Sequence, residues 1–199
     1  MVDPVLRRLI DEGGPLRPED RRRGRPGDAY GALVRSIVGQ QLSTKAARSI
    51  WSRITGLFGG ETPSPAQILA APPAWLRDAG LSGAKVEYLR DLASRVEDGR
   101  LDFDRLEELS DADVIADLTE IKGVGRWTAE MFLMFHLGRA DVISTGDLGI
   151  RRAVQLAYGL DELPGPHDLE RLAQPWRPHR TLACLYLWRS LDNIPGPVP

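Results

Sequence analysis

Apolar residues recur along this chain at the spacing of helix faces. In the segment around Leu33, Val34, Ile37 and Val38, the apolar positions fall at i, i+1, i+4 and i+5, and a similar face runs through residues 84–97. The sequence contains no convincing strand-like alternation, no repeat and no low-complexity tract. The pattern therefore predicts an all-α fold.

Capping residues and prolines set the expected helix bounds. Ser43 suits an N-cap, Gly59-Gly60 suits a stop, and Ser110 with Asp113 resembles a capping box. The expected helices span residues 30–40, 43–57, 65–70, 73–79, 84–97, 110–118, 127–137, 147–158 and 179–191. Breaks at residues 59–65 and 139–146 predict two helical subdomains, with the chain ends packed separately or beside the second.

Composition excludes several classes of protein. With 199 residues, of which 42 % are hydrophobic, the chain can bury a sizeable core. A single Cys excludes a disulfide framework, an iron–sulfur cluster on four thiolates and a Cys-rich zinc site. No stretch approaches the roughly 20 apolar residues of a membrane span, and the first residues lack a signal-peptide core. We expect a cytoplasmic protein with no membrane partner.

Charge is distributed unevenly along the chain. The total is −2, but residues 97–120 hold ten acidic and two basic side chains, a local net of −8, so the rest carries +6. Of the 26 basic residues 23 are Arg, which pairs with phosphate bidentately. The run Arg21-Arg22-Arg23-Gly24-Arg25 is either a solvated loop or a phosphate contact. The distribution is compatible with a basic face toward nucleic acid.

The most informative segment is Ile121-Lys122-Gly123-Val124-Gly125-Arg126-Trp127-Thr128. A helix ends, a turn with two glycines follows, and a new helix begins. Amides near Gly123 and Gly125 can point outward together at a helix N-terminus and bind phosphate without reading sequence. Val124 can plug the hairpin into the core. An ordinary glycine-rich helix connection is the alternative.

This segment resembles the helix-hairpin-helix of the HhH-GPD DNA glycosylase superfamily, here at about residues 111–137. Asp147, in Ser144-Thr145-Gly146-Asp147, lies 22 positions after Gly125, where that family has its catalytic Asp. Ile37–Ser43, Gly80–Lys85 and Trp176–Trp188 resemble the AlkA-type branch, 3-methyladenine DNA glycosylase II. The resemblance covers residues 28–192 in family order. It implies two helical subdomains with the active-site cleft between them, in one glycosylase unit over residues 1–199. The fewer than 30 residues before the match are too few for the N-terminal β-domain of larger bacterial members.

The resemblance implies a monofunctional glycosylase that flips and hydrolytically excises alkylated purines from double-stranded DNA. Breaking the N-glycosidic bond builds positive charge on the deoxyribose, which a carboxylate at Asp147 stabilises while it orients or deprotonates water. The helix N-terminus favours the ionised form. Asp147 is also a suitable N-cap, and the two roles are compatible.

Further site residues follow from the same resemblance. Trp127 and Trp188 line the base pocket, where an indole attracts a cationic alkylated base; Met131 gives an adaptable wall, and Phe132 and Tyr30 are further lining candidates. We interpret Trp51, Trp75 and Trp176 as core residues. Gln41 is the expected wedge that fills the gap left by the flipped nucleotide, Leu42 anchors its loop, and Leu81 touches the opposite strand. For both loops a buried position is the alternative. The residues expected at phosphate are Lys122, Gly123, Val124, Gly125, Arg126 and Thr128.

No cofactor is expected to be required. The family often holds a monovalent cation, Na⁺ or K⁺, on hairpin carbonyls, and the matching positions are Thr119, Ile121 and Val124. The expected partner is double-stranded DNA with alkylated bases, bound by a monomer in the nucleoid.

Two other functions compete with this interpretation. A bifunctional glycosylase/lyase would use a Lys two residues after the second hairpin glycine, where this chain has Trp127. A DNA-binding module without chemistry would need the hairpin but not Asp147, Trp127 and Trp188. Release of free base from methylated DNA discriminates between an enzyme and a binding module.

Overall fold

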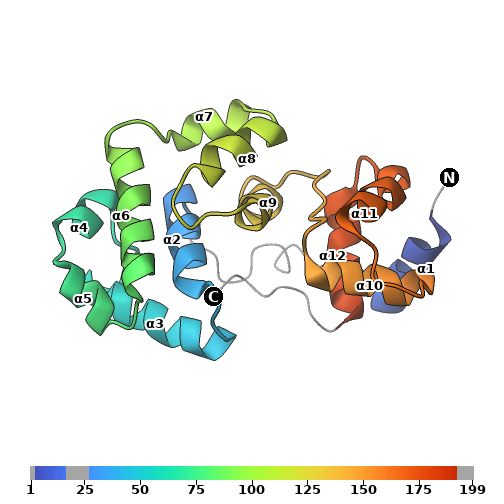
Figure 1. The fold of residues 1–199 in the computed structure, drawn as a ribbon, viewed down its shortest axis with the longest axis horizontal. Helices are drawn as coiled ribbons and strands as arrows, with labels where there is room; N and C mark the ends of the chain where they lie inside the picture. The colour runs from blue at the N-terminus through green and yellow to red at the C-terminus, as the bar shows by residue number, and fades with distance from the viewer. Residues whose placement is uncertain (1–2, 17–26, 192–199) are drawn as a thin grey trace. The chain divides into compact units, whose positions relative to one another are not determined.

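A computed structural model describes residues 3–16 and 27–191. These residues form helices and no strand, as the periodicity predicts (Figure 1). The helices are α1 (Pro4–Gly13), α2 (Ala29–Gly39), α3 (Thr44–Leu57), α4 (Pro65–Ala70), α5 (Pro73–Asp78), α6 (Gly83–Glu97), α7 (Phe103–Glu108), α8 (Asp111–Thr119), α9 (Arg126–Phe135), α10 (Leu148–Tyr158), α11 (Pro166–Leu172), the 3₁₀ turn η2 (Gln174–Trp176) and α12 (Arg180–Ser190).

The described residues divide into two compact units. Residues 27–132 form one, and residues 3–16 with 133–191 form the other. Two helical units were expected, but the expected breaks are wrong as boundaries. The division falls between Phe132 and Leu133, inside α9, so one continuous helix contributes residues to both units.

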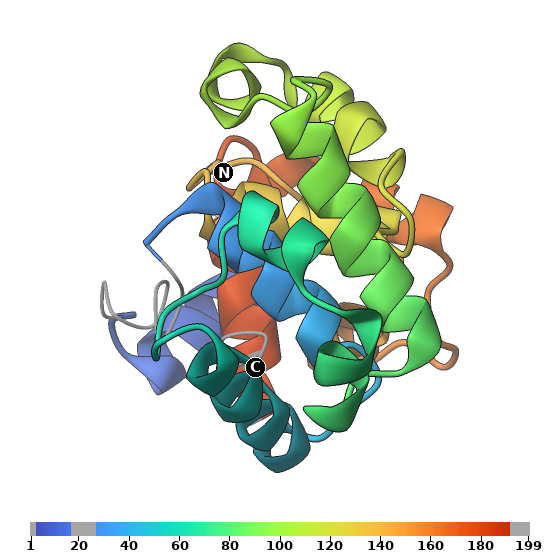
Figure 2. The same ribbon diagram turned by 90° about the vertical axis from the view of Figure 1, so that its left-hand side faces the viewer.

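The unit of residues 27–132 is built around α2 and α6. Leu33, Val34, Ile37 and Val38 of α2 are at most 1 % exposed, which places the predicted apolar face in the core. Helix α6 contacts α2, α4 and α5, and α2 contacts α3 (Figure 2). Because α6 packs along α2, its side chains can reach the loop that follows α2.

The unit of residues 3–16 and 133–191 is built around α12, which contacts both α1 and α10. Trp176 is 4 % exposed, which confirms its interpretation as a core residue. Its indole donates to the Asp3 carboxylate at 3.1 Å, and Tyr158 donates to the same oxygen at 2.7 Å. Asp3 also caps α1, since it accepts from the amides of Val5 and Leu6.

Several expectations need correction. Helices α1, α7 and α11 were not expected. Trp75 is expected in the core but is 53 % exposed. Trp51 is half-buried, and the guanidinium carbon of Arg35 lies 5.4 Å from the centre of its ring.

The run Arg21–Arg25 lies outside the described residues. No helix in the part of the chain that the structure describes is long and apolar enough to cross a membrane.

Candidate active site and DNA interface

Asp147 is the N-cap of α10, as its position after the Gly146 turn predicted. Its Oδ1 atom accepts a hydrogen bond from the Ile150 amide at 2.7 Å and another from the Trp188 indole at 3.0 Å. Gly149 leaves room for this arrangement, because a Cβ there would lie 3.0 Å from Asp147 Oδ1 and 3.3 Å from the indole. The carboxylate is therefore fixed by one main-chain and one side-chain donor.

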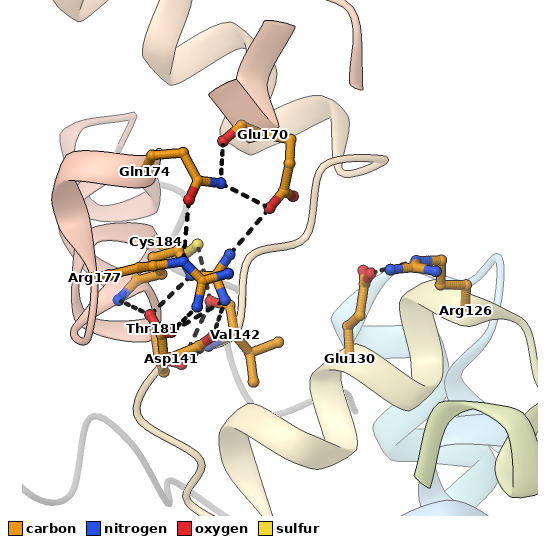
Figure 3. A network of polar contacts seen from close by, with 10 residues as sticks. Arg126, Glu130, Asp141, Val142, Glu170, Gln174, Arg177, Thr181 and Cys184 are labelled. Atoms are coloured by element: carbon orange, nitrogen blue, oxygen red, sulfur yellow. Dashed lines mark hydrogen bonds and ion pairs between the residues drawn. The ribbon is translucent and has the colours of Figure 1, made fainter. Parts of the chain in front are cut away.

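The loop that leads to Asp147 is held by the start of α12. Arg180 is 8 % exposed. Its guanidinium donates to the Asp141 carboxylate at 2.8 Å and to the Asp141 carbonyl at 2.6 Å. Thr181 Oγ1 donates to the Arg139 carbonyl at 2.7 Å and accepts from the Val142 amide at 3.1 Å. Figure 3 shows Asp141, Val142 and Thr181 in this network. Burial raises the pKa of the Asp141 carboxyl, but Arg180 and Arg177 outweigh it and hold that pKa below its usual range.

Trp188, which the resemblance places in the lining of the base pocket, is buried. The residue is 1 % exposed, and its ring stacks on Phe135 with centroids 6.0 Å apart. Trp188 lies eight residues after Arg180 on α12, and its indole N–H donates to Asp147. Helix α12 thus fixes both the loop and the carboxylate. Sequence reasoning missed this donor role because nothing in the local pattern pairs residues 41 positions apart.

The hairpin turn lies between α8 and α9. Ile121 and Val124 are 1 % and 4 % exposed, which agrees with the expected plug, and the Val124 amide donates to the Ile121 carbonyl at 3.0 Å. Within residues 27–191, the amides of Gly123 and Gly125 donate to no protein acceptor. Such amides at a helix N-terminus suit an external anion.

The two hairpin glycines differ in their surroundings. Gly123 has φ +77°, and a Cβ there would overlap the ring of Tyr88 on α6. Gly125 has open space around its Cα and an ordinary φ. Gly123 is therefore required by the packing of the turn, whereas Gly125 keeps the outer surface of the turn clear.

Two side chains on one face of helix α6 form hydrogen bonds with the hairpin. Asp91 Oδ2 accepts from the Lys122 amide at 2.9 Å, and Arg95 donates to the Glu120 carboxylate at 3.0 Å and the Glu120 carbonyl at 2.8 Å. The Lys122 amide is therefore committed inside the protein. Its exposed side chain is the part of Lys122 that can face phosphate.

Arg126 and Thr128 open α9 but present different groups. The Arg126 side chain is 71 % exposed and donates from Nε to Glu130 Oε1 at 2.8 Å (Figure 3). Glu130, in a residue 2 % exposed, orients this guanidinium. Thr128 is 5 % exposed, so its side chain offers no exposed group to phosphate.

The loop after α2, residues Gln40–Leu42, is called the wedge loop here. Gln41 is exposed and has φ 58°, the one non-glycine residue with positive φ among the residues described. Leu42 is half-buried, which suits an anchor. Leu81 is 5 % exposed, so its side chain is buried, as the alternative interpretation has it. It offers no exposed group for the expected contact with the opposite DNA strand.

Two polar side chains hold the wedge loop. The Lys85 ammonium on α6 donates to the carbonyls of Val38 at 2.8 Å and Gln40 at 2.6 Å. Burial lowers the pKa of Lys85. Gln40 Nε2 donates to the Gly123 carbonyl at 2.7 Å, which joins the wedge loop to the hairpin.

The residues expected in the base pocket vary in exposure. Trp127 is 38 % exposed, whereas Met131 and Phe132 are 3 % and 4 % exposed. Tyr30 is 8 % exposed, and its buried hydroxyl has no hydrogen-bond partner in the part of the molecule that is described. Burial, together with the negative charges of Asp28 and Glu97, raises the pKa of Tyr30. A buried, unpartnered hydroxyl is uncommon in proteins.

The candidate cation ligands in the hairpin are main-chain oxygens. The residues that the structure describes place no group of three or more His, Cys, Asp or Glu side chains where it could hold a metal. The predicted cation ligands Thr119, Ile121 and Val124 lie at the end of α8 and in the turn, and the Ile121 carbonyl already accepts the Val124 amide. Their hard oxygen donors fit Na⁺ or K⁺.

Comparison with known proteins places the chain among repair enzymes. Residues 34–178 match the HhH-GPD superfamily of base excision DNA repair proteins. DNA-3-methyladenine glycosylase 1 of Schizosaccharomyces pombe is 33 % identical over 191 residues, which cover 95 % of this chain and 83 % of that protein.

Two solved structures are also similar to this chain. A DNA-3-methyladenine glycosidase from Bacillus halodurans superimposes with a TM-score of 0.85 at 44 % identity, covering 94 % of this chain and 84 % of that one. The Schizosaccharomyces pombe 3-methyladenine DNA glycosylase Mag1, in complex with abasic DNA, gives a TM-score of 0.84 at 32 % identity and covers 96 % and 93 %.

Proposed function

The chain belongs to the HhH-GPD superfamily of base excision DNA repair proteins, and we propose that it excises alkylated purines from double-stranded DNA as a monofunctional DNA-3-methyladenine glycosylase. The similar proteins named DNA-3-methyladenine glycosylase support this activity. The observation that carries the proposal is the Asp147 carboxylate, fixed at a helix N-terminus by the Ile150 amide and the Trp188 indole.

Asp147 performs the chemistry through its negative charge. As the glycosidic bond breaks, positive charge develops on the deoxyribose, and a carboxylate held in place stabilises it without reorganising during the reaction. The Ile150 amide and the Trp188 indole hold the carboxylate in place. The carboxylate then orients or deprotonates the attacking water.

The base is held by aromatic and adaptable side chains. Trp127 presents an exposed indole on the first turn of α9, and an indole face attracts a cationic purine by roughly 0.5–2 kcal/mol. Met131 follows one turn later on the same helix. Tyr30 is a further candidate lining residue, and its hydroxyl is buried without a partner among the described residues.

DNA is bound through its phosphates rather than its sequence. The hairpin amides, the Lys122 ammonium and the Arg126 guanidinium are all suited to phosphate oxygens. Affinity should therefore fall steeply with salt, with a log–log slope of about −0.9 per phosphate contact, and should vary little with sequence. Titration of several duplexes at increasing KCl tests this. A flat dependence would contradict the hairpin assignment.

A water nucleophile leaves an intact abasic site. A lyase needs an amine beside the departing base, but Trp127 occupies the position that carries Lys in bifunctional relatives, and the Lys85 ammonium is engaged by two carbonyls. Borohydride added during turnover should trap no protein–DNA adduct, and strand breaks should appear only after alkali. An adduct lost on replacing one of the three Lys would contradict the monofunctional assignment.

Three accessory features complete the proposal. A monovalent cation on the carbonyls of Thr119, Ile121 and Val124 would screen the hairpin from the phosphate, and no cofactor is required. The protein acts as a monomer. It works in the nucleoid, where its substrate lies.

Base release is the decisive experiment. Defined duplexes with 3-methyladenine, 7-methylguanine, 1-methyladenine, ethenoadenine or hypoxanthine should be incubated with the protein and with Asp147→Asn, and free base quantified. Release of at least one alkylated purine by the wild type alone supports the proposal. Binding of every duplex with no release of any base would identify a hairpin module without chemistry.

A further inference from the structure

The conformation of Gln41 needs an explanation. A non-glycine residue at φ 58° is strained and persists only where its surroundings determine it. Nothing in the local sequence favours this conformation, since Gln is not a residue that readily adopts positive φ. Contacts from elsewhere in the fold must therefore hold the wedge loop.

Lys85 makes those contacts. Its ammonium lies 2.6 Å from the Gln40 carbonyl, which belongs to the peptide group directly before Gln41. Orienting that peptide group restricts φ of Gln41. The same ammonium lies 2.8 Å from the Val38 carbonyl at the end of α2, where a cation is favoured by unpaired carbonyls and the helix dipole.

Gln40 connects this arrangement to the phosphate-binding turn. Its side-chain amide donates to the Gly123 carbonyl at 2.7 Å, and Gly123 itself packs on Tyr88 of α6. Lys85 and Tyr88 are three positions apart on α6, so they lie on the same face of the helix. One helix thus supports the wedge loop and the hairpin together, as its position beside α2 allows (Figure 2).

We propose that Lys85 is a positioning residue for base flipping, which holds Gln41 in the left-handed conformation from which it enters the gap left by the extruded nucleotide. The hydrogen bond from Gln40 to Gly123 links the wedge loop to the hairpin, so that the residues that bind phosphate and the wedge are held in a fixed relation to each other. The inference rests on the proposed function, because it assigns Gln41 the role of wedge. The simpler alternative is that Lys85 only stabilises the end of α2.

The first test measures wedge insertion without requiring excision. A duplex carries a tetrahydrofuran abasic analogue with 2-aminopurine in the opposite strand, whose fluorescence rises when the stack is opened. Lys85→Met keeps an unbranched apolar side chain that ends where the Lys Cε lies, but removes the ammonium. We expect it to lose most of the fluorescence rise, like Gln41→Ala. Lys45→Met on α3 is the matched control, since it also removes one positive charge, and it should keep the rise.

The second test compares excision of the same lesion in a stable pair and in a mismatch. Extrusion costs most from a stable pair, so Lys85→Met should slow single-turnover release roughly tenfold there and about threefold or less in the mismatch. Lys85→Met/Gln41→Ala should be no slower than Gln41→Ala alone, because both changes disable one device. Additive effects, or an unchanged ratio of the two rates, would overturn the proposal.

Folding and activity are controlled separately. If thermal unfolding shows that Lys85→Met does not fold, Gln40→Met breaks the link to Gly123 at a half-buried position and should produce the same loss of fluorescence. A wild-type rise on the abasic duplex in folded Lys85→Met, or in Gln40→Met where Lys85→Met does not fold, would overturn the proposal. Failure of the wild type to release any base would instead refute the glycosylase assignment, and the fluorescence comparison would still decide the present question.

Discussion

The N-termini of α9 and α10 use the same physical feature for opposite purposes. Helix α10 begins with Asp147, whose carboxylate accepts the Ile150 amide at 2.7 Å. Helix α9 follows Gly125, which has no side chain to cap the helix, and within residues 27–191 the amides of Gly123 and Gly125 donate to no protein acceptor. One helix end thus holds the protein's own anion, and we propose that the other binds an anion from outside.

This difference separates chemistry from binding. An internal carboxylate at a helix N-terminus is fixed in place, which suits it to stabilise charge on a sugar. An uncapped N-terminus with outward amides attracts phosphate without distinguishing sequences. Substitutions at the two helix ends should therefore damage different steps of one reaction.

The largest effect is expected at the filled end. Asp147→Asn keeps the size and capping ability of the side chain but removes its charge. Base release should fall at least a hundred- to a thousandfold, while affinity for an abasic duplex stays unchanged. Single-turnover release and fluorescence anisotropy measure the two quantities. Release at the wild-type rate would mean that Asp147 is only a cap.

Trp188 provides a smaller change at the same end. Trp188→Phe retains an aromatic ring against Phe135 but removes the indole donor to Asp147 Oδ1. We expect release to slow about tenfold, with affinity for abasic DNA retained. In the Asp147→Asn background the same substitution should have little further effect, because the donor acts through the carboxylate. Equal losses in both backgrounds would assign Trp188 to the base pocket alone.

The open end offers a matched pair of glycines. Gly125→Ala adds a methyl group where the protein leaves open space, so stability should be kept and affinity for every duplex should fall by roughly threefold to tenfold. Gly123→Ala should lower both affinity and melting temperature, because its Cβ meets Tyr88 and its φ is +77°. Calorimetry and anisotropy distinguish them. A Gly125→Ala variant with wild-type affinity would show that phosphate does not approach this residue.

Asp3 repeats the arrangement of Asp147 without the chemistry. It also caps a helix and accepts from a tryptophan indole, that of Trp176. Burial raises the pKa of Asp3, but hydrogen bonds from Tyr158, Trp176 and two amides outweigh it and hold the pKa below its usual value. A depressed carboxyl pKa stabilises the fold above the unfolded pKa of about 3.9, and this contribution is lost as pH falls through the lower folded value.

Asp3→Asn should therefore cost roughly 1–3 kcal/mol of unfolding free energy at pH 7, and less at pH 3. Base release at 25 °C should remain at the wild-type level. Urea unfolding at the two pH values, together with the release assay, gives the answer. A loss of base release in folded Asp3→Asn would contradict a purely structural role for Asp3.

The parts that the sequence predicted are those with local causes. The periodic apolar faces, the glycine turn and the N-cap at Asp147 all follow from neighbouring residues. Helix α1 was missed although Asp3, Pro4 and the apolar spacing of residues 5–10 signal it. Helices α7 and α11 have six and seven residues, too few for periodicity to identify.

The contacts that position the site could not be predicted in this way. Lys85 reaches carbonyls 45 and 47 residues away, and Trp188 reaches a carboxylate 41 residues away. Main-chain carbonyls exist at every residue, so no sequence pattern selects those of Val38 and Gln40. The positive φ of Gln41 likewise follows from packing rather than residue type.

The contrast between the two helix ends is tested most directly by crossing two variants with two measurements. Asp147→Asn and Gly125→Ala are each assayed for single-turnover release of an N-methylated purine at saturating protein and for affinity to an abasic duplex. We predict that Asp147→Asn loses release and keeps affinity, and that Gly125→Ala loses affinity and keeps the saturated rate of release. Parallel loss of both quantities in either variant would contradict the division between chemistry at α10 and phosphate binding at α9.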